Sequence, residues 1–117
     1  IASWGLTFKA LTDDLRDSPA VEIVTRLLAD GASVTVFDPT VTVAPKGLDA
    51  ITVSASPHEA CAGADVIAVL TEWDDFRWVS PVEAAGVVRI KQIVDARNLL
   101  DRSEWRRAGF EYQGIGR

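Results

Sequence analysis

Two positively charged side chains follow apolar stretches of the sequence by a few residues. Lys9 lies in the segment TFKALTDDLRDSP, and Arg97 lies in the segment VDARN. An ammonium group is a point charge and a guanidinium group is a bidentate fork, and together they are a common means of binding phosphate groups. The alternative is that both are surface cations paired with Asp13, Asp14 or Asp95. Spacing alone leaves both interpretations open.

The other charged residues of the first segment also admit two roles. Arg16 lies just before Ser18, where a helix is predicted to begin, and a cation there opposes the helix dipole. Helix stability therefore does not explain Arg16, which leaves an ion pair with Asp13 or Asp17, or contact with a ligand. The adjacent acids Asp13 and Asp14 have the form of a catalytic pair. Turn formation or dipole compensation is the commoner role for such acids, and no nucleophile or pKa partner accompanies them.

The first predicted strand-to-helix turn does not carry a dinucleotide fingerprint. That motif needs three spaced glycines so that the backbone can approach a pyrophosphate. Gly5 stands alone here, although Asp38 ends the second predicted strand where a ribose-binding acid is expected. We therefore do not expect this domain to bind NAD by itself.

The sequence offers no metal site and no activated nucleophile. His58 is the only histidine, is expected to be exposed, and has no cysteine or second histidine at ligand spacing. Cys61 is the only cysteine, and with no histidine to activate it we expect a small buried apolar residue. Trp4 and Trp105 are expected in the core, whereas Trp73 is expected to combine packing with ligand contact.

Strand-like and helix-like patterns alternate along the chain. A cap at Ser18 and a stop at Gly31 bound a helix whose apolar face is Ala20, Ile23, Val24, Leu27 and Leu28, and Ser56 with Glu59 forms a capping box. Strands are predicted at residues 1–6, 33–37, 51–54, 65–70, 91–96 and 110–114, further helices after 56, at 80–85 and at 101–108, and loops at 40–49 and 71–77.

This alternation predicts a single three-layer α/β domain with a doubly wound, mainly parallel, Rossmann-like sheet. The simplest strand order, 3-2-1-4-5-6, places the first, fourth and fifth strands side by side, and ligands of such sheets bind beyond the carboxyl ends of the strands. The residues that follow those three strands include Lys9, Trp73 and Arg97. We therefore expect these three side chains around one crevice.

Composition limits the possible functions. The 117 residues are 48% hydrophobic and 25% charged, as in an ordinary globular domain, and no apolar run is long enough to span a membrane. A net charge of −5 argues against sequence-independent binding of nucleic acid. A single cysteine gives no sign of an oxidising compartment, so we expect a cytoplasmic protein. The chain begins at Ile1 inside a predicted strand and lacks methionine, which suggests a domain of a longer protein.

Four motifs, in order, carry a resemblance that covers essentially all of residues 1–117. They are GLTFKALTDDLRDSPA, LTEWDDF, VDARNLLD and AGFEYQGIGR. With them the chain resembles the C-terminal, UDP-binding domain of the UDP-glucose/GDP-mannose dehydrogenase family. The resemblance implies oxidation of the primary alcohol of a UDP-sugar to a carboxylate by two hydride transfers to NAD. It also implies an N-terminal NAD-binding domain and a central helical domain as partners, and we expect a homo-oligomer at full length.

The resemblance also implies roles for individual residues. Phe8, Lys9 and Arg97 match positions that bind the UDP-sugar, and Arg16 matches an arginine that reaches the NAD held by the other domain. Cys61 does not match the family's catalytic cysteine, so this chain alone is expected to be inert. The motif TEWDDF is more similar to enzymes for UDP-glucose than to those for UDP-N-acetylmannosamine or GDP-mannose, which stay as alternatives. A non-catalytic folding and assembly module is a further alternative.

Overall fold

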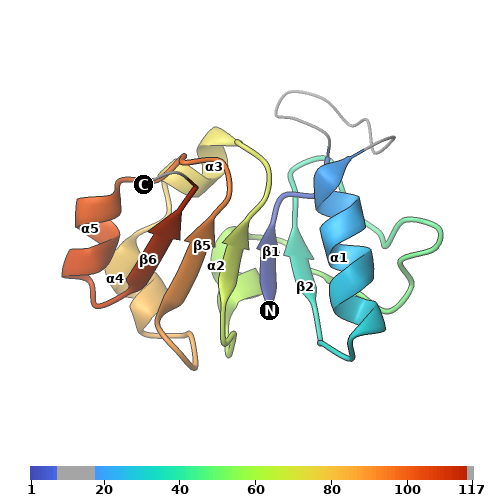
Figure 1. The fold of residues 1–117 in the computed structure, drawn as a ribbon, viewed down its shortest axis with the longest axis horizontal. Helices are drawn as coiled ribbons and strands as arrows, with labels where there is room; N and C mark the ends of the chain where they lie inside the picture. The colour runs from blue at the N-terminus through green and yellow to red at the C-terminus, as the bar shows by residue number, and fades with distance from the viewer. Residues whose placement is uncertain (8–17, 116–117) are drawn as a thin grey trace.

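A computed structural model describes residues 1–7 and 18–115 of the chain (Figure 1). In chain order the elements are β1 (Ala2–Trp4), α1 (Pro19–Ala29), β2 (Thr35–Phe37), β3 (Thr52–Val53), α2 (Pro57–Cys61), β4 (Ile67–Val69), α3 (Asp74–Arg77), α4 (Pro81–Ala85), β5 (Gln92–Asp95), α5 (Arg102–Arg107) and β6 (Glu111–Gly114). Among these helices, none is long and apolar enough to cross a membrane.

The strands of the described residues form one sheet in the order β3-β2-β1-β4-β5-β6, and every pair of neighbours is parallel. The predicted strand order is confirmed, and so is the predicted edge position of β3. In a parallel sheet all carboxyl ends lie along one edge. The loops after β1, β4 and β5 therefore meet at the centre of that edge, as a doubly wound fold requires.

Local sequence signals start and stop the helices as predicted. Ser18, Ser56, Ser80 and Asp101 each accept a hydrogen bond from a backbone N–H three residues later, at 3.4, 3.0, 3.3 and 3.1 Å. These caps satisfy donors that a helix start otherwise leaves unpaired. Gly31 follows α1 at φ +91°, a left-handed conformation that a glycine adopts without a steric penalty.

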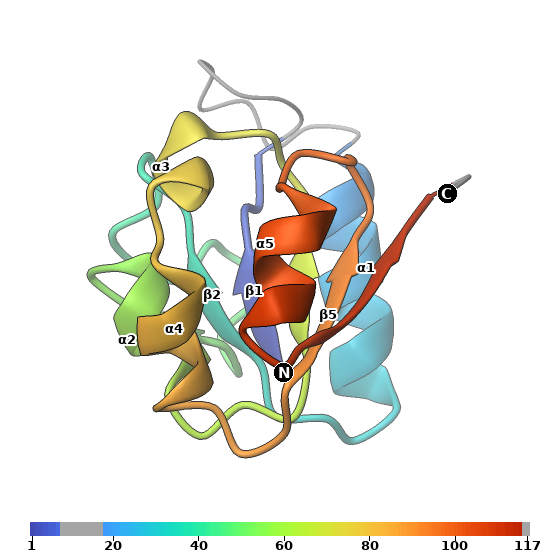
Figure 2. The same cartoon turned by 90° about the vertical axis from the view of Figure 1, so that its left-hand side faces the viewer.

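Each face of the sheet has its own core. On one face α1 packs through Ala20 and Val24, whereas α2, α4 and α5 cover the other face, and Figures 1 and 2 show the helices on these two sides. The second face is centred on Trp4, which stacks on Phe76 with the ring centroids 5.4 Å apart and meets Trp105 edge-on at 5.9 Å. The three layers and the core positions of Trp4 and Trp105 are as predicted.

The expectation of a loop at 71–77 is wrong, because residues Asp74–Arg77 form α3. One short turn carries no helical periodicity that a sequence can reveal. Tertiary packing orders it, because Phe76 is fully buried against Trp4.

The prediction that Ile23 belongs to the buried apolar face of α1 is also wrong. Ile23 is 39% exposed, although Ala20 and Val24 on the same helix are buried. Ala20 and Val24 lie one turn apart and form a narrow contact stripe, and Ile23 lies beside that stripe.

Candidate functional site

The carboxyl edge of the sheet contains two of the residues predicted to bind ligand. Trp73 follows β4 and Arg97 follows β5, so the structure places both in the adjoining loops where the sequence predicted them. Phe8, Lys9 and Arg16 lie outside the described residues. Thr7 and Ser18 are the described residues on either side of this segment, and the hydroxyl of Ser18 donates to the carbonyl of Leu6 at 2.8 Å. This hydrogen bond holds the start of α1 next to the residues that follow β1.

Asp38, at the end of β2, links the loops that follow three strands. Its carboxylate is 1% exposed and accepts hydrogen bonds from the backbone N–H groups of Leu6 at 2.8 Å and Thr7 at 3.0 Å. The indole of Trp73 donates to the same oxygen at 3.3 Å, and Thr40 donates to the other oxygen through its N–H at 2.9 Å and its hydroxyl at 2.7 Å. Asp38 therefore holds the edge together, and its oxygens are occupied within the protein.

A close backbone approach joins the loop after β1 to the loop after β4. Gly5 has φ +105°, and a side-chain Cβ at this position would lie 2.4 Å from Cβ of Thr71 and 2.7 Å from its nitrogen. The hydroxyl of Thr71 donates to the carbonyl of Thr7 at 3.0 Å, and that of Ser3 donates to the carbonyl of Gly5 at 3.0 Å. Only glycine fits between the two loops.

Arg97 is a cation that the described edge presents to solvent. Its guanidinium meets Glu72 with an N–O distance of 2.8 Å, and the two side chains are 35% and 45% exposed. Asp95 is one of the acids considered as a partner of Arg97. It accepts a hydrogen bond from the backbone N–H of Arg97 at 3.1 Å and none from its guanidinium. An exposed pair of this kind stabilises the fold by at most ~1 kcal/mol. An anionic ligand can therefore displace Glu72 from the guanidinium, or share the guanidinium with it, at little cost in free energy.

Asp95, at the end of β5, is a second buried acid of the edge. It is fully buried and accepts hydrogen bonds from the backbone N–H of Leu100 at 2.8 Å and from the hydroxyl of Tyr112 at 2.7 Å. These bonds fix the β5–α5 loop against β6. The backbone that carries Arg97 is therefore held in place by a neighbouring carboxylate.

Sequence reasoning missed the roles of Asp38, Thr71 and Glu72. Thr71 and Glu72 directly follow the apolar run that forms β4, so their position at a strand end was a signal that we did not use. The burial of Asp38 had no sequence signal, because the donors to its buried oxygen, on Leu6, Thr7 and Trp73, are more than 30 residues away along the chain.

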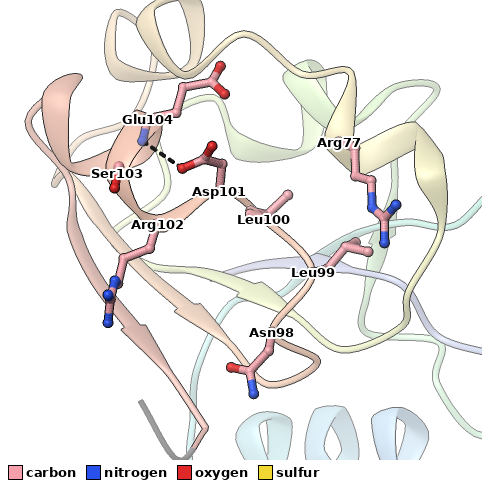
Figure 3. A pocket seen from close by; sticks show the side chains of 8 residues that line it. All are labelled: Arg77, Asn98, Leu99, Leu100, Asp101, Arg102, Ser103 and Glu104. Atoms are coloured by element: carbon pink, nitrogen blue, oxygen red, sulfur yellow. Dashed lines mark hydrogen bonds between the residues drawn. The ribbon is translucent and has the colours of Figure 1, made fainter.

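A pocket lies beside this edge, next to the loop that follows Arg97. It encloses about 630 Å³ and is lined by Arg77, Asn98, Leu99, Leu100, Asp101, Arg102, Ser103 and Glu104. Figure 3 shows Arg77 and Arg102 on opposite sides of the pocket, with Asp101 accepting the N–H of Glu104 between them. Its two cations are matched by two acids, so the pocket has no net preference for an anion.

The remaining candidates for chemistry are inert in this structure. Burial raises the pKa of the Cys61 thiol from 9.0 to about 11, so the thiol stays protonated at neutral pH. His58 is exposed, as predicted. The described residues contain no group of three or more side chains suited to a metal ion. The pKa of Asp65 is lowered by its hydrogen bond from Arg89, but both side chains are at the surface, away from the edge.

Comparisons with known proteins identify the family of this chain. Residues 2–102 match the model of the UDP-glucose/GDP-mannose dehydrogenase family, UDP binding domain. The chain belongs to this family. The UDP-glucose 6-dehydrogenases of Rhizobium meliloti and Rickettsia prowazekii are 40% and 41% identical to this UDP-binding domain over 100% and 99% of its length. The domain spans 27% of the length of each of these curated relatives.

Solved structures show the same fold. The UDP-binding domain superposes on a crystal structure of NDP-N-acetyl-D-galactosaminuronic acid dehydrogenase from Methanosarcina mazei with a TM-score of 0.84 and 32% identity. That match covers 98% of this chain and 24% of the other. The UDP-binding domain is therefore similar to one part of larger dehydrogenases.

Proposed function

We propose that this domain supplies part of the UDP-sugar site of an NAD-dependent dehydrogenase that oxidises UDP-glucose to UDP-glucuronate. The domain binds the nucleotide sugar and contributes no catalytic residue. Membership of the family supports this proposal, as does the identity of about 40% to enzymes named UDP-glucose 6-dehydrogenase. The hydride transfer itself belongs to the parts of the longer enzyme that this chain lacks.

The observation that carries the proposal is the position of Arg97. Its guanidinium lies at the carboxyl edge of the central strands, on a backbone fixed by Asp95, and its only described ionic partner is the exposed Glu72. A phosphate group can take the place of Glu72 and receive two parallel N–H donors from the fork. In this proposal Phe8 and Lys9 contact the same UDP-sugar, and Trp73 forms the wall of the crevice.

A titration of this chain with UDP tests the role of Arg97. Hydrogen bonds to charged groups are worth about 1.5–3 kcal/mol, so Arg97→Ala is expected to weaken UDP binding roughly ten- to a hundredfold in calorimetry. Arg97→Lys is expected to recover only part of the affinity, since an ammonium cannot form a fork. The matched control is Arg26→Ala, which removes an exposed arginine that pairs with Glu22 on α1.

Two outcomes contradict this function. If Arg97→Ala and Arg26→Ala bind UDP with equal affinity, Arg97 is not part of the UDP site. No UDP binding by this chain, together with full activity of the Arg97→Ala enzyme at full length, favours the alternative of a folding and assembly module.

We assign Arg16 to the NAD side of the site, on the resemblance alone. In the full-length enzyme Arg16→Ala is expected to raise the KM for NAD and to leave UDP affinity nearly unchanged. Loss of UDP binding in that variant contradicts the assignment. This chain by itself is expected to produce no NADH from UDP-glucose, because it has neither a dinucleotide fingerprint nor an activated thiol.

The identity of the sugar is the second part of the proposal. The motif TEWDDF and the names of the relatives favour UDP-glucose. UDP-N-acetylmannosamine and GDP-mannose are the competing substrates. Comparing kcat/KM of the full-length enzyme for the three nucleotide sugars distinguishes them, and a preference for either competitor overturns the assignment without affecting the role of Arg97.

A further inference from the structure

Asn98 is the only asparagine of the chain, and it adopts an unusual backbone conformation. Its φ is +52°, and every other positive φ among the residues that the structure describes belongs to a glycine. Asparagine enters the left-handed region more readily than most residues with a side chain, but still at a steric cost. Figure 3 shows Asn98 in the loop that leads from β5 to α5. The unusual backbone therefore directly follows Arg97, the cation proposed to bind the UDP-sugar.

The side-chain amide of Asn98 holds the backbone just beyond β6. Its Nδ2 donates to the carbonyl of Ile115 at 2.7 Å, and the N–H of Ile115 donates to its Oδ1 at 2.9 Å. Strands β5 and β6 pair as far as Asp95 and Gly114, so Ile115 lies one residue beyond the last paired position. A primary amide has both a donor and an acceptor, as a peptide group does. This pair of hydrogen bonds, the Asn98–Ile115 clamp, therefore extends the ladder between β5 and β6.

The clamp is attached to the turn that carries Arg97. The backbone N–H of Asn98 donates to the carbonyl of Asp95 at 3.4 Å, and the N–H of Arg97 donates to the carboxylate of Asp95 at 3.1 Å. Ala96 and Arg97 are thus the two central residues of a tight turn. Asp95 begins this turn in the buried sheet, whereas Asn98 ends it in an exposed position. The clamp therefore ties the exposed end of the turn to β6.

We propose that Asn98 is a positioning residue, whose clamp holds this turn so that the guanidinium of Arg97 is ordered before the UDP-sugar binds. This role rests on the proposed binding of UDP by Arg97. The guanidinium reaches across the edge to Glu72, in the loop after β4. A side chain already held in that direction loses little conformational freedom when a phosphate replaces Glu72. A side chain on a loose turn has to be ordered during binding, at a cost in affinity.

Two substitutions separate the clamp from the backbone conformation. Asn98→Gly removes both hydrogen bonds and keeps a positive φ accessible without a steric penalty. Asn98→Ala removes the same hydrogen bonds and adds that penalty. Because Asn98 is exposed, its loss leaves no buried polar group unpaired, and the global stability of Asn98→Gly is expected to change little. If the clamp orders Arg97, both variants lose UDP affinity; if the positive φ alone does so, Asn98→Gly binds UDP like the parent.

Calorimetric titration of the 117-residue chain with UDP is the main test. Asn98→Gly is expected to weaken UDP binding roughly three- to tenfold, the usual cost of ordering one long side chain on binding. In the Arg97→Ala background the same substitution is expected to have no further effect, because Asn98 acts through Arg97. The control is Gly31→Ala, at the far end of α1, where φ is also positive. It is expected to lower the urea midpoint at least as much and to keep the parental UDP affinity.

Amide hydrogen exchange provides a readout that needs no ligand. The N–H of Arg97 is expected to exchange at least about threefold faster in Asn98→Gly, because the turn opens locally once the clamp is gone. In Gly31→Ala the exchange of this N–H is expected to be as in the parent. Unchanged exchange at Arg97 in Asn98→Gly overturns the positioning role, whether or not the chain binds UDP.

The UDP titrations distinguish failure of this role from failure of the proposed function. If Arg97→Ala binds UDP as tightly as the parent, the proposed function itself is wrong. If Arg97→Ala weakens binding but Asn98→Gly does not, only the positioning role is wrong. An equal loss from Asn98→Gly with and without Arg97 also contradicts it, because Asn98 then acts on UDP binding by another route.

Discussion

Asp38 and Asp95 are both buried acids at the carboxyl ends of strands, yet they connect different parts of the molecule. The donors to Asp38 come from the loops after β1, β2 and β4. The donors to Asp95 come from the loop that follows its own strand and from β6. Asp38 therefore joins separate loops across the sheet, and Asp95 fixes one loop.

The two acids share a feature that matters for ligand binding. Among the described residues no lysine or arginine side chain pairs with either of them, and N–H and O–H donors satisfy both carboxylates instead. Neutral donors stabilise a buried carboxylate without taking up a cation. As a result the guanidinium of Arg97 remains at the surface of the edge, where an anion can reach it.

The largest effect is expected from Asp38→Ala. This change leaves the N–H groups of Leu6 and Thr7 and the indole of Trp73 without their acceptor in a buried place, so the free energy of unfolding is expected to fall by about 3–5 kcal/mol. Urea unfolding measures it. Asp49→Ala removes an exposed acid as the control and is expected to change stability by less than about 0.5 kcal/mol. Equal effects of the two variants contradict the role given to Asp38.

Gly5→Ala tests the close approach of the loops that Asp38 connects. A Cβ at this position overlaps Thr71 and the backbone is at φ +105°, so a loss of about 3 kcal/mol is expected. Gly31→Ala is the matched control, because Gly31 has φ +91° but no atom within 4 Å of the added Cβ. Its loss is expected to be about 1 kcal/mol, and the difference between the two variants isolates the cost of the contact.

Tyr112→Phe examines the Asp95 region. The variant removes the hydroxyl that donates to Asp95 but leaves the N–H of Leu100 in place, so a loss of about 1 kcal/mol is expected in thermal or urea unfolding. If Tyr112→Phe lowers the free energy of unfolding as much as Asp38→Ala does, the two acids contribute equally to stability, which contradicts the difference described between them.

The smallest effect on stability is expected from Glu72→Gln. The ion pair of Glu72 with Arg97 is partly exposed to solvent, so the free energy of unfolding is expected to change by less than about 0.5 kcal/mol. UDP affinity is expected to rise slightly, because Arg97 no longer has a competing carboxylate. A clear loss of stability shows that this pair belongs with the buried acids and is not a surface contact.

Much of the fold was predictable from short-range signals. Ser18, Ser56 and Asp101 are recognisable caps, and the apolar run at β4 is recognisable as a buried strand. The alternation of strands with helices then restricts the sheet to a few strand orders, because connections between parallel strands are almost always right-handed. The helix α3 and the exposure of Ile23 were not predictable, since both depend on which surfaces meet after the sheet has formed.

The sequence by itself determined the class of the domain, the strand order and the place of Arg97 after a central strand. Caps, turns and apolar runs act between neighbours in the chain, so they can be read before folding. Only the tertiary structure decided which acids are buried. In the sequence Asp38 and Asp95 look like the exposed Asp30 and Asp49. Asp38 in particular becomes a link between loops only when donors from distant segments converge on it, and that convergence exists only in the assembled sheet.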